Sequence, residues 1–179
     1  MPADVFEEIA RGAASESSLW ASALRPGEER EPTAVFSALV PEQRFALGVE
    51  TIYEGYLLHY GASRLFAPPD EDVALLLGDA LLAHGLVRIA STGSLAAVAD
   101  VAALLSLCAQ VRADGVDGDA AAWAATSALL GRGGLDGARE ALRTRRDSGP
   151  LELLARSVAG DDAVAEALAL HEARARSIV

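Results

Sequence analysis

The sequence contains one cysteine, few aromatic residues and few basic residues, and each shortage removes a class of protein. Its single cysteine, Cys108, can form neither an intrachain disulfide nor a cysteine cluster for a metal. Fifteen basic residues stand against 26 acidic ones, which gives a net charge of −11 and a pI near 4.6. Such a chain repels phosphate-rich polymers over most of its surface, so we expect no nucleic-acid partner.

Signals for export and for membrane insertion are also missing. Residues 1–8 are acidic where a secretory signal carries basic residues followed by an apolar run. The most apolar stretch, Leu95–Val111, is interrupted by Asp100 and falls short of the roughly 18 uninterrupted apolar residues of a membrane span. We therefore expect a cytoplasmic protein that spans no membrane, with this stretch as a buried core helix.

Apolar residues recur at spacings of three and four along nearly the whole chain, and no segment alternates apolar and polar residues over strand length. This pattern predicts an all-α fold. Only 5% of residues are aromatic and most of the 51% hydrophobic content is alanine and leucine, which favours helices. The length of 179 residues fits a single domain, residues 1–179. Helices are predicted over residues 4–24, 34–39, 41–66, 70–92, 94–112, 120–130, 136–145, 150–159 and 162–177.

Polar residues mark the starts of several predicted helices. Asp70, followed by two further acids, stands at the positive end of one helix dipole, and Ser94 caps the next helix. The loop 113–119 is similar to a calcium loop but lacks the glutamate that an EF-hand carries at its twelfth position. We therefore interpret Asp119 as a cap for the following helix, and we predict neither a metal site nor a cofactor.

Three segments carry motifs in a characteristic order. The first follows the pattern E-x-x-H-x-x-x-L-[IL]-H-D-D-x-x-D, at Glu50, Leu57, Leu58 and His59. The second, Leu75–Ala83, is similar to A-x-L-x-G-D-x-L-L-A. The third, Ala125–Leu130, is more weakly similar to K-T-A-x-L and lacks its lysine. Together they resemble the trans-prenyl (polyprenyl) diphosphate synthases, whose aspartates hold the magnesium ions that bind the allylic diphosphate.

The resemblance implies a truncated isoprenoid-synthase-like helical bundle. In that arrangement residues 1–32 are an N-terminal helix and linker, residues 41–130 are the isoprenoid-synthase-like core, and residues 131–179 are C-terminal helices that match no motif.

The residues that carry catalysis in that family are replaced here. Tyr53 stands where the family has its first histidine, and the three aspartate positions hold Tyr60, Gly61 and Arg64. These residues cannot supply the clustered oxygen ligands that a magnesium ion needs to neutralise a departing diphosphate. No second aspartate-rich motif follows in the sequence. We therefore expect no prenyl transfer by this chain alone, and the resemblance implies a pseudoenzyme.

Three tyrosines and an arginine share one face of the predicted helix 41–66. Tyr53, Tyr56, Tyr60 and Arg64 lie at i, i+3, i+7 and i+11, with Leu57 beside them. One interpretation, which the family geometry supports, is a face that lines a cavity, with Arg64 near its mouth and able to hold a phosphate. The other is an aromatic core seam in which Arg64 reaches solvent or pairs with an acid.

Acidic residues on the same two helices are interpreted as structural. Glu50 and Glu54 lie one turn apart, but neither is followed by histidine at i+3 as a di-iron site requires. Asp79 lies among leucines, where a carboxylate needs a partner. We expect it to accept a hydrogen bond between helices from Tyr53 or His59.

Two pairs of glycines have matching spacing. Gly48 and Gly55 are seven residues apart on one predicted helix, and Gly78 and Gly85 are seven apart on the next. Glycine inside a helix costs about 1 kcal/mol against alanine, so this pattern indicates close contact between two helix backbones.

Three functions remain open. The resemblance favours a non-catalytic partner subunit of a catalytic prenyl diphosphate synthase, which would set product length in isoprenoid or menaquinone side-chain synthesis. The second is a protein that binds an isoprenoid, quinone or other lipid in the remnant cavity. The third is a structural homodimer without a ligand. All three involve a homo- or hetero-oligomer or a lipid ligand, and none requires this chain to be an enzyme.

Overall fold

A computed structural model describes residues 2–175, with side chains from Val5 onward. Within these residues it contains α-helices and no β-strand, which confirms the all-α class. The helices are α1 Pro2–Glu16, α2 Ser18–Ala23, α3 Ala46–Tyr60, α4 Glu71–Ser91, α5 Leu95–Ala113, α6 Asp119–Ala128, α7 Asp136–Arg145, α8 Gly149–Ala159 and α9 Asp161–Glu172. Three short 3₁₀ turns lie between α2 and α3: η1 Gly27–Glu29, η2 Ser37–Leu39 and η3 Gln43–Phe45.

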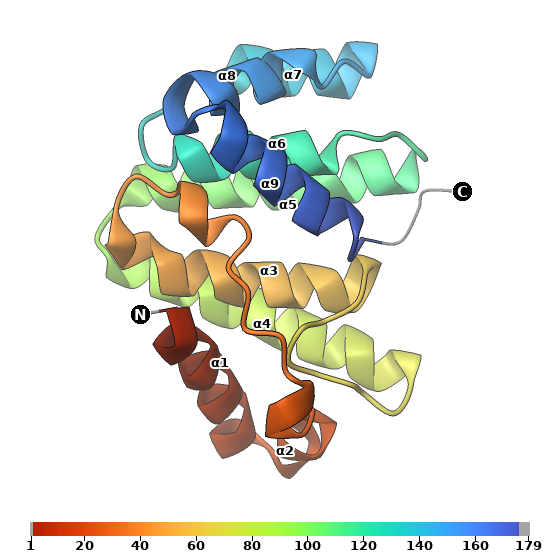
Figure 1. The fold of residues 1–179 in the computed structure, drawn as a ribbon. Helices are drawn as coiled ribbons and strands as arrows, with labels where there is room; N and C mark the ends of the chain where they lie inside the picture. The colour runs from red at the N-terminus through yellow and green to blue at the C-terminus, as the bar shows by residue number, and fades with distance from the viewer. Residues whose placement is uncertain (1, 176–179) are drawn as a thin grey trace.

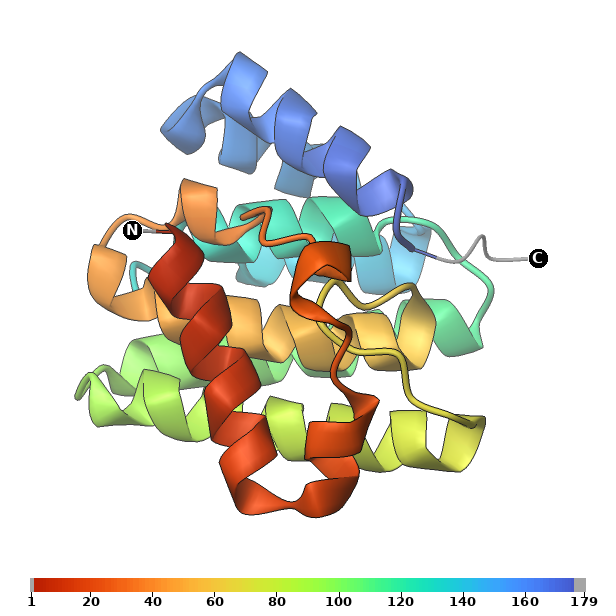
Figure 2. The same ribbon diagram turned by 60° about the horizontal axis from the view of Figure 1, so that its bottom comes forward.

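Helix α3 lies at the centre and packs most extensively against α4 (Figure 1). The hairpin of α1 and α2 lies at one end of the molecule, where α1 crosses α3 (Figure 2). Helices α7, α8 and α9 lie at the other end and rest on α5 and α6. The larger part of the core surrounds Trp123 and Tyr53, and a smaller part around Phe6 and Leu77 lies beneath α1.

Two predicted helices are shorter than the sequence pattern suggested. The predicted helix 4–24 is interrupted at Ser17, whose extended backbone and side chain cap a separate helix α2. The predicted helix 41–66 begins only at Ala46 and ends at Tyr60. The chain beyond it, up to Phe66, turns back along the end of α2. Arg64 therefore does not belong to the helical face on which its spacing placed it.

Helix starts were predicted more accurately. The Asp70 side chain accepts a hydrogen bond from Val73 N at 2.8 Å, and Ser94 accepts one from Ala97 N at 3.2 Å, which confirms both as N-caps. Asp119 is not a cap: Gly118 holds that position with φ +132°, and Asp119 is the first residue of α6. The predicted end of the last helix, at residue 177, lies outside the described residues.

The four glycines lie where α3 and α4 meet. A Cβ atom added to Gly55 would lie 2.8 Å from Gly78 O, and one added to Gly85 would lie 3.0 Å from Gly48 O. Real Cβ atoms essentially never come closer than 3.0 Å to a neighbouring atom, and contacts at 3.0 Å are rare. The backbones of α3 and α4 are therefore in direct contact at these positions.

Helices α4 and α5 are long and apolar enough to cross a membrane, by length and composition alone. Core helices of soluble proteins meet the same criterion, but less than half of each segment is buried here. The charge inside α5 is neutralised: Asp100 Oδ1 lies 3.1 Å from Arg139 Nη2, and both side chains are buried. The expectation that the chain spans no membrane stays a prediction.

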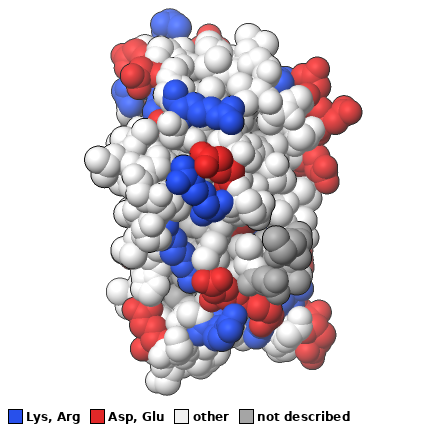
Figure 3. Space-filling view, turned by 90° about the vertical axis from the view of Figure 1, so that its left-hand side faces the viewer, with Lys and Arg blue, Asp and Glu red and all other residues white. Residues whose placement is uncertain are grey.

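On the face drawn in Figure 3, basic and acidic side chains lie next to one another in small groups, and uncharged surface lies between the groups. Exposed pairs such as Arg44 with Glu42, at 3.0 Å, bring opposite charges together. This view shows no continuous basic surface.

Candidate functional site

The structure places Arg64 in the core, so the prediction that it lies near the mouth of a cavity is wrong. Its guanidinium is fully buried between two carboxylates, with Nη2 2.6 Å from Glu50 Oε2 and Nε 2.5 Å from Glu54 Oε1. The same group lies over the rings of Phe6 and Tyr53, at 4.8 and 5.0 Å. Arg64 pairs with acids, as the core interpretation proposed.

The two glutamates accept further hydrogen bonds besides those from Arg64. Glu50 Oε1 accepts hydrogen bonds from Val35 N and Ser37 N, and Glu54 Oε2 accepts one from Ser63 Oγ. Burial by itself lowers the pKa of Arg64, but the charges of Glu50 and Glu54 outweigh it and raise the pKa above its ordinary value. Arg64 therefore stays charged, and its bonds to Glu50 and Glu54 tie α3 to the segments before and after it.

The tyrosine face of α3 is an aromatic seam. Tyr53, Tyr56 and Leu57 are fully buried, and both tyrosine rings pack edge-on against Trp123, at 5.1 and 5.4 Å. Tyr60 is half-buried and lines a hollow of about 170 Å³ together with Tyr56. Typical ligand pockets have roughly 300–1,000 Å³, so this hollow is too small to hold a prenyl chain.

Asp79 is paired but is not buried. Its Oδ1 lies 3.1 Å from His59 Nε2, while its side chain is 73% exposed. The expected contact between the helices therefore forms with His59. Tyr53 instead contacts His171, 118 residues further along the chain.

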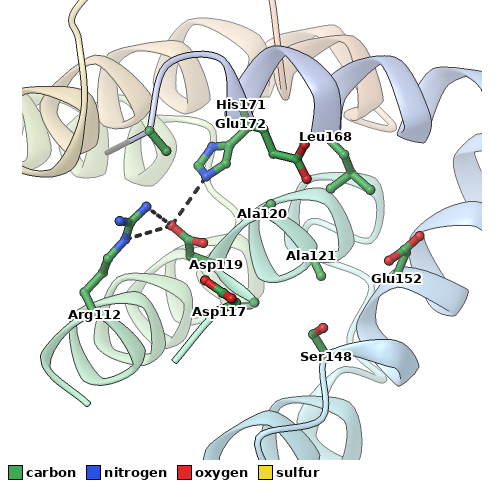
Figure 4. A pocket seen from close by; sticks show the side chains of 12 residues that line it. Arg112, Asp117, Asp119, Ala120, Ala121, Ser148, Glu152, Leu168, His171 and Glu172 are labelled. Carbon is green, nitrogen blue, oxygen red and sulfur yellow. Dashed lines mark hydrogen bonds and ion pairs between the residues drawn. The ribbon is translucent and has the colours of Figure 1, made fainter. Parts of the chain in front are cut away.

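A second polar cluster forms around Asp119, where α3, α5, α6 and α9 meet (Figure 4). Tyr56 OH donates a hydrogen bond to Asp119 Oδ2, and Arg112 donates two to the same oxygen, from Nε at 2.9 Å and Nη2 at 2.5 Å. His171 Nε2 lies 3.4 Å from this oxygen, and His171 Nδ1 lies 3.0 Å from Tyr53 OH. Asp119 is 6% exposed.

Local structure explains why these side chains meet. Arg112 lies in the last turn of α5 and Asp119 in the first turn of α6, so the loop 114–118 brings them together. Gly118 permits this turn, because its φ of +132° is one that side chains rarely adopt. His171 reaches the same point from the last turn of α9.

The cluster fixes the charge of its members. Burial alone raises the pKa of Asp119, but its contacts with His171 and Tyr56 and the charge of Arg112 outweigh it and hold the pKa below its usual range. Burial raises the pKa of Tyr56 well above that of an ordinary tyrosine. At neutral pH the carboxylate is therefore ionised and the phenol is protonated.

An open pocket of about 520 Å³ lies above this cluster, between α6, α8 and α9. Its volume falls within the usual range for ligand sites. Its lining includes the polar side chains of Arg112, Asp117, Asp119, Glu152, His171 and Glu172. In the part of the chain that the structure describes, no three histidine, cysteine or acidic side chains are grouped so that they could hold a metal ion.

The sequence pattern does not predict this site. It indicates Asp119 only as a helix cap and does not single out Arg112 or His171. The only local signal is that Arg112 and Asp119 lie on either side of a glycine-containing turn. His171 lies 52 residues beyond Asp119 in the sequence. Only the packing of α9 on α6 reveals that contact.

The fold and the pocket define an all-α helical protein with a polar, acidic pocket over a buried Asp–His–Arg–Tyr cluster. Comparison with protein-family models, with curated proteins and with solved structures found no match.

Proposed function

We propose that this chain is a non-catalytic subunit that binds a helical protein partner through the outer surface of α4 and α5. The observation that carries the proposal is the chemistry of that surface. On it Leu76, Val87 and Leu95 are 57, 68 and 85% exposed. Monomeric proteins rarely leave large contiguous apolar surfaces in water, and such surfaces mark sites of interaction.

Uncharged residues, apolar except for Ser106 and exposed except for the half-buried Ala80, follow a helix-pairing repeat. Successive residues are separated alternately by four and three positions in both helices: Leu76, Ala80, Ala83, Val87 and Ala90 in α4, and Leu95, Ala99, Ala102, Ser106 and Ala109 in α5. We call these ten residues the α4–α5 face. This spacing is that of the buried seam between paired helices, and its many alanines allow close approach. The occupant that fits is another helix.

Charge is nearly absent from the α4–α5 face. Beyond the first turn of α4, Asp79 is the only strongly exposed charged residue of the two helices, both of which are described completely. The chain as a whole carries a net charge of −11. Because this surface is uncharged, a partner can cover it without removing charged side chains from water, which would be costly.

The class of partner comes from the resemblance to the prenyl diphosphate synthases. We propose a catalytic synthase subunit, because this chain has Tyr60, Gly61 and Arg64 in place of the metal-binding aspartates. Arg64 is also committed to Glu50 and Glu54. Binding of a lipid by the tyrosine face is less well supported, since Tyr53 and Tyr56 are packed against the protein's own core.

Co-expression with a full-length prenyl diphosphate synthase from the same source tests the proposal. We expect a stable heteromer in size-exclusion chromatography with light scattering, and a changed distribution of product lengths. Val87→Glu places a charge on the α4–α5 face and should weaken the complex at least about tenfold, since a buried charge without a partner is costly. Leu153→Glu is the matched control, because Leu153 of α8 is 69% exposed, close to the 68% of Val87.

The outcomes separate the alternatives. A complex lost in Val87→Glu and kept in Leu153→Glu supports the proposal. If the chain forms no heteromer but forms a homodimer that Val87→Glu disrupts and Leu153→Glu does not, the partner is a second copy of this chain. If the chain is a monomer and neither substitution changes its behaviour, the α4–α5 face is not an interface.

A further inference from the structure

The α4–α5 face has one charged neighbour, Asp79. This residue lies three positions after Leu76 and four before Ala83, so on the surface of α4 it borders both of these members of the face. Its side chain is 73% exposed. A helix that covers the α4–α5 face therefore also covers a carboxylate.

Asp79 lies at the hollow between the two helices of the face. Asp79 and Leu82 of α4 and Leu105 and Ala109 of α5 line this space of about 170 Å³, and so does Tyr60. Ala109 is also a member of the α4–α5 face, so the hollow is continuous with the face. At about 30 Å³ for each water molecule, the space corresponds to roughly six waters, which is room for one long side chain.

The carboxylate of Asp79 is only partly paired within the chain. Its Oδ1 lies 3.1 Å from His59 Nε2. Its Oδ2 accepts no hydrogen bond from any residue that the structure describes. In the free protein this oxygen is solvated, because the side chain is exposed. Once a partner excludes that water, the oxygen is costly unless the partner supplies a donor.

A second copy of this chain that presented the same face would offer no such donor. None of the ten residues of the α4–α5 face is basic. The basic residues elsewhere on these two completely described helices are His84, Arg88 and Arg112, and each is bound to a residue of its own chain. The charge of Asp79 therefore favours a different chain as the partner.

We infer that the partner helix presents an arginine to Asp79 Oδ2 and lays the apolar part of that side chain in the hollow. A guanidinium supplies charged donors in a plane that suits both a carboxylate and an aromatic ring, and Tyr60 provides the ring. Its methylene groups fit against Leu82 and Leu105. This inference rests on the proposed function, because it names the chemistry of the partner at that surface. It makes Asp79 the residue that selects the partner.

Two fluorescent helical peptides test the inference on the full chain. Both have about 21 residues, with leucine and alanine at the positions of the helix-pairing repeat, and they differ only at one central flanking position, which is arginine or glutamate. Binding is measured by fluorescence anisotropy near pH 7.5 in roughly 0.1 M salt, where diffuse attraction is screened beyond about 10 Å. We expect the arginine peptide to bind at least about tenfold more tightly than the glutamate peptide.

Substitutions at Asp79 should change this preference in a defined order. Asp79→Asn should reduce it to within about threefold, and Asp79→Arg should reverse it. Glu28→Arg, in the exposed η1, changes the net charge as much as Asp79→Arg and should leave the preference within about twofold. Circular dichroism checks that all variants are folded.

The inference is overturned if neither peptide binds, if both bind equally, or if Asp79→Arg and Glu28→Arg shift the preference alike. A homodimer that Val87→Glu disrupts would also overturn it, because a second copy brings no arginine to Asp79. The proposed function can fail separately. A synthase complex that Val87→Glu disrupts and Asp79→Arg leaves intact keeps the interface and removes the arginine. An Asp79-dependent preference without a synthase complex keeps the arginine and gives the face another helical partner.

Discussion

Removing the positive charge from the buried triad should destabilise the protein strongly. Arg64→Met keeps a long apolar side chain between Phe6 and Tyr53 but leaves Glu50 and Glu54, which are 1 and 0% exposed, without a counter-ion. Breaking a buried pair on one side costs about 3–5 kcal/mol. Loss of the 2.6 Å bond from Arg64 Nη1 to Thr33 O adds to this. Since small proteins are stable by only about 5–15 kcal/mol, we expect a loss of roughly one third or more of the stability.

A second variant separates charge from packing. Glu50→Gln, Glu54→Gln and Arg64→Met together remove all three charges and keep similar volumes. Replacing a whole buried triad by less polar groups is often nearly neutral, so the triple variant should recover at least about half of the loss. Arg44→Met is the control for a change of net charge, because Arg44 is half exposed; its effect should stay within about 0.5 kcal/mol.

The assay is guanidinium chloride unfolding at pH 7, followed by circular dichroism. The reasoning is refuted if Arg64→Met costs less than about 1 kcal/mol at pH 7. It is also refuted if the triple variant is as unstable as the single one.

Three further predictions concern the helix contact and the polar cluster. Gly85→Ala forces a methyl group against the backbone of α3 and should cost about 1–3 kcal/mol in the free energy of unfolding, whereas Gly137→Ala, with open space around it, should gain about 0.5 kcal/mol. Burial raises the pKa of Tyr53 and Tyr56, so these phenols should ionise, by absorbance at 295 nm, only together with alkaline unfolding; ionisation in a fully folded protein would contradict their burial. The pKa of Asp119 is lowered, so its stabilisation should be present at neutral pH and lost on acidification; Asp119→Asn should flatten the acid limb of stability against pH, and an unchanged limb would argue against the cluster.

The sequence predicts features of this protein that depend on neighbours along the chain. Asp70 and Ser94 cap their helices because capping needs only the side chain and the backbone three residues later. The all-α class follows from a repeat that every helix carries on its own. The Asp119 cluster does not follow in this way, because His171 reaches it through the packing of α9, which no local pattern encodes.

The end of α3 shows how a contact that is not helical can override a helical pattern. The spacing of Tyr53, Tyr56, Tyr60 and Arg64 fits one continuous face, but the chain leaves the helix after Tyr60. Beyond that point Ser63 Oγ and the Arg64 guanidinium both bind Glu54. A helix that continued past Tyr60 would carry these two groups away from the Glu54 carboxylate. The bonds that form instead involve a charged carboxylate in the core, and such bonds are stronger than those between neutral groups.

This ending also bears on the missing aspartates. The pattern of the prenyl diphosphate synthases places its aspartates along one helix, whereas here the third matching position, Arg64, lies past the helix end with its side chain in the core. Aspartates introduced at positions 60, 61 and 64 would therefore not rebuild a metal site, because the third would lie beside Glu50 and Glu54 as another buried negative charge. The chain therefore differs from that pattern in the path of its backbone as well as in its side chains.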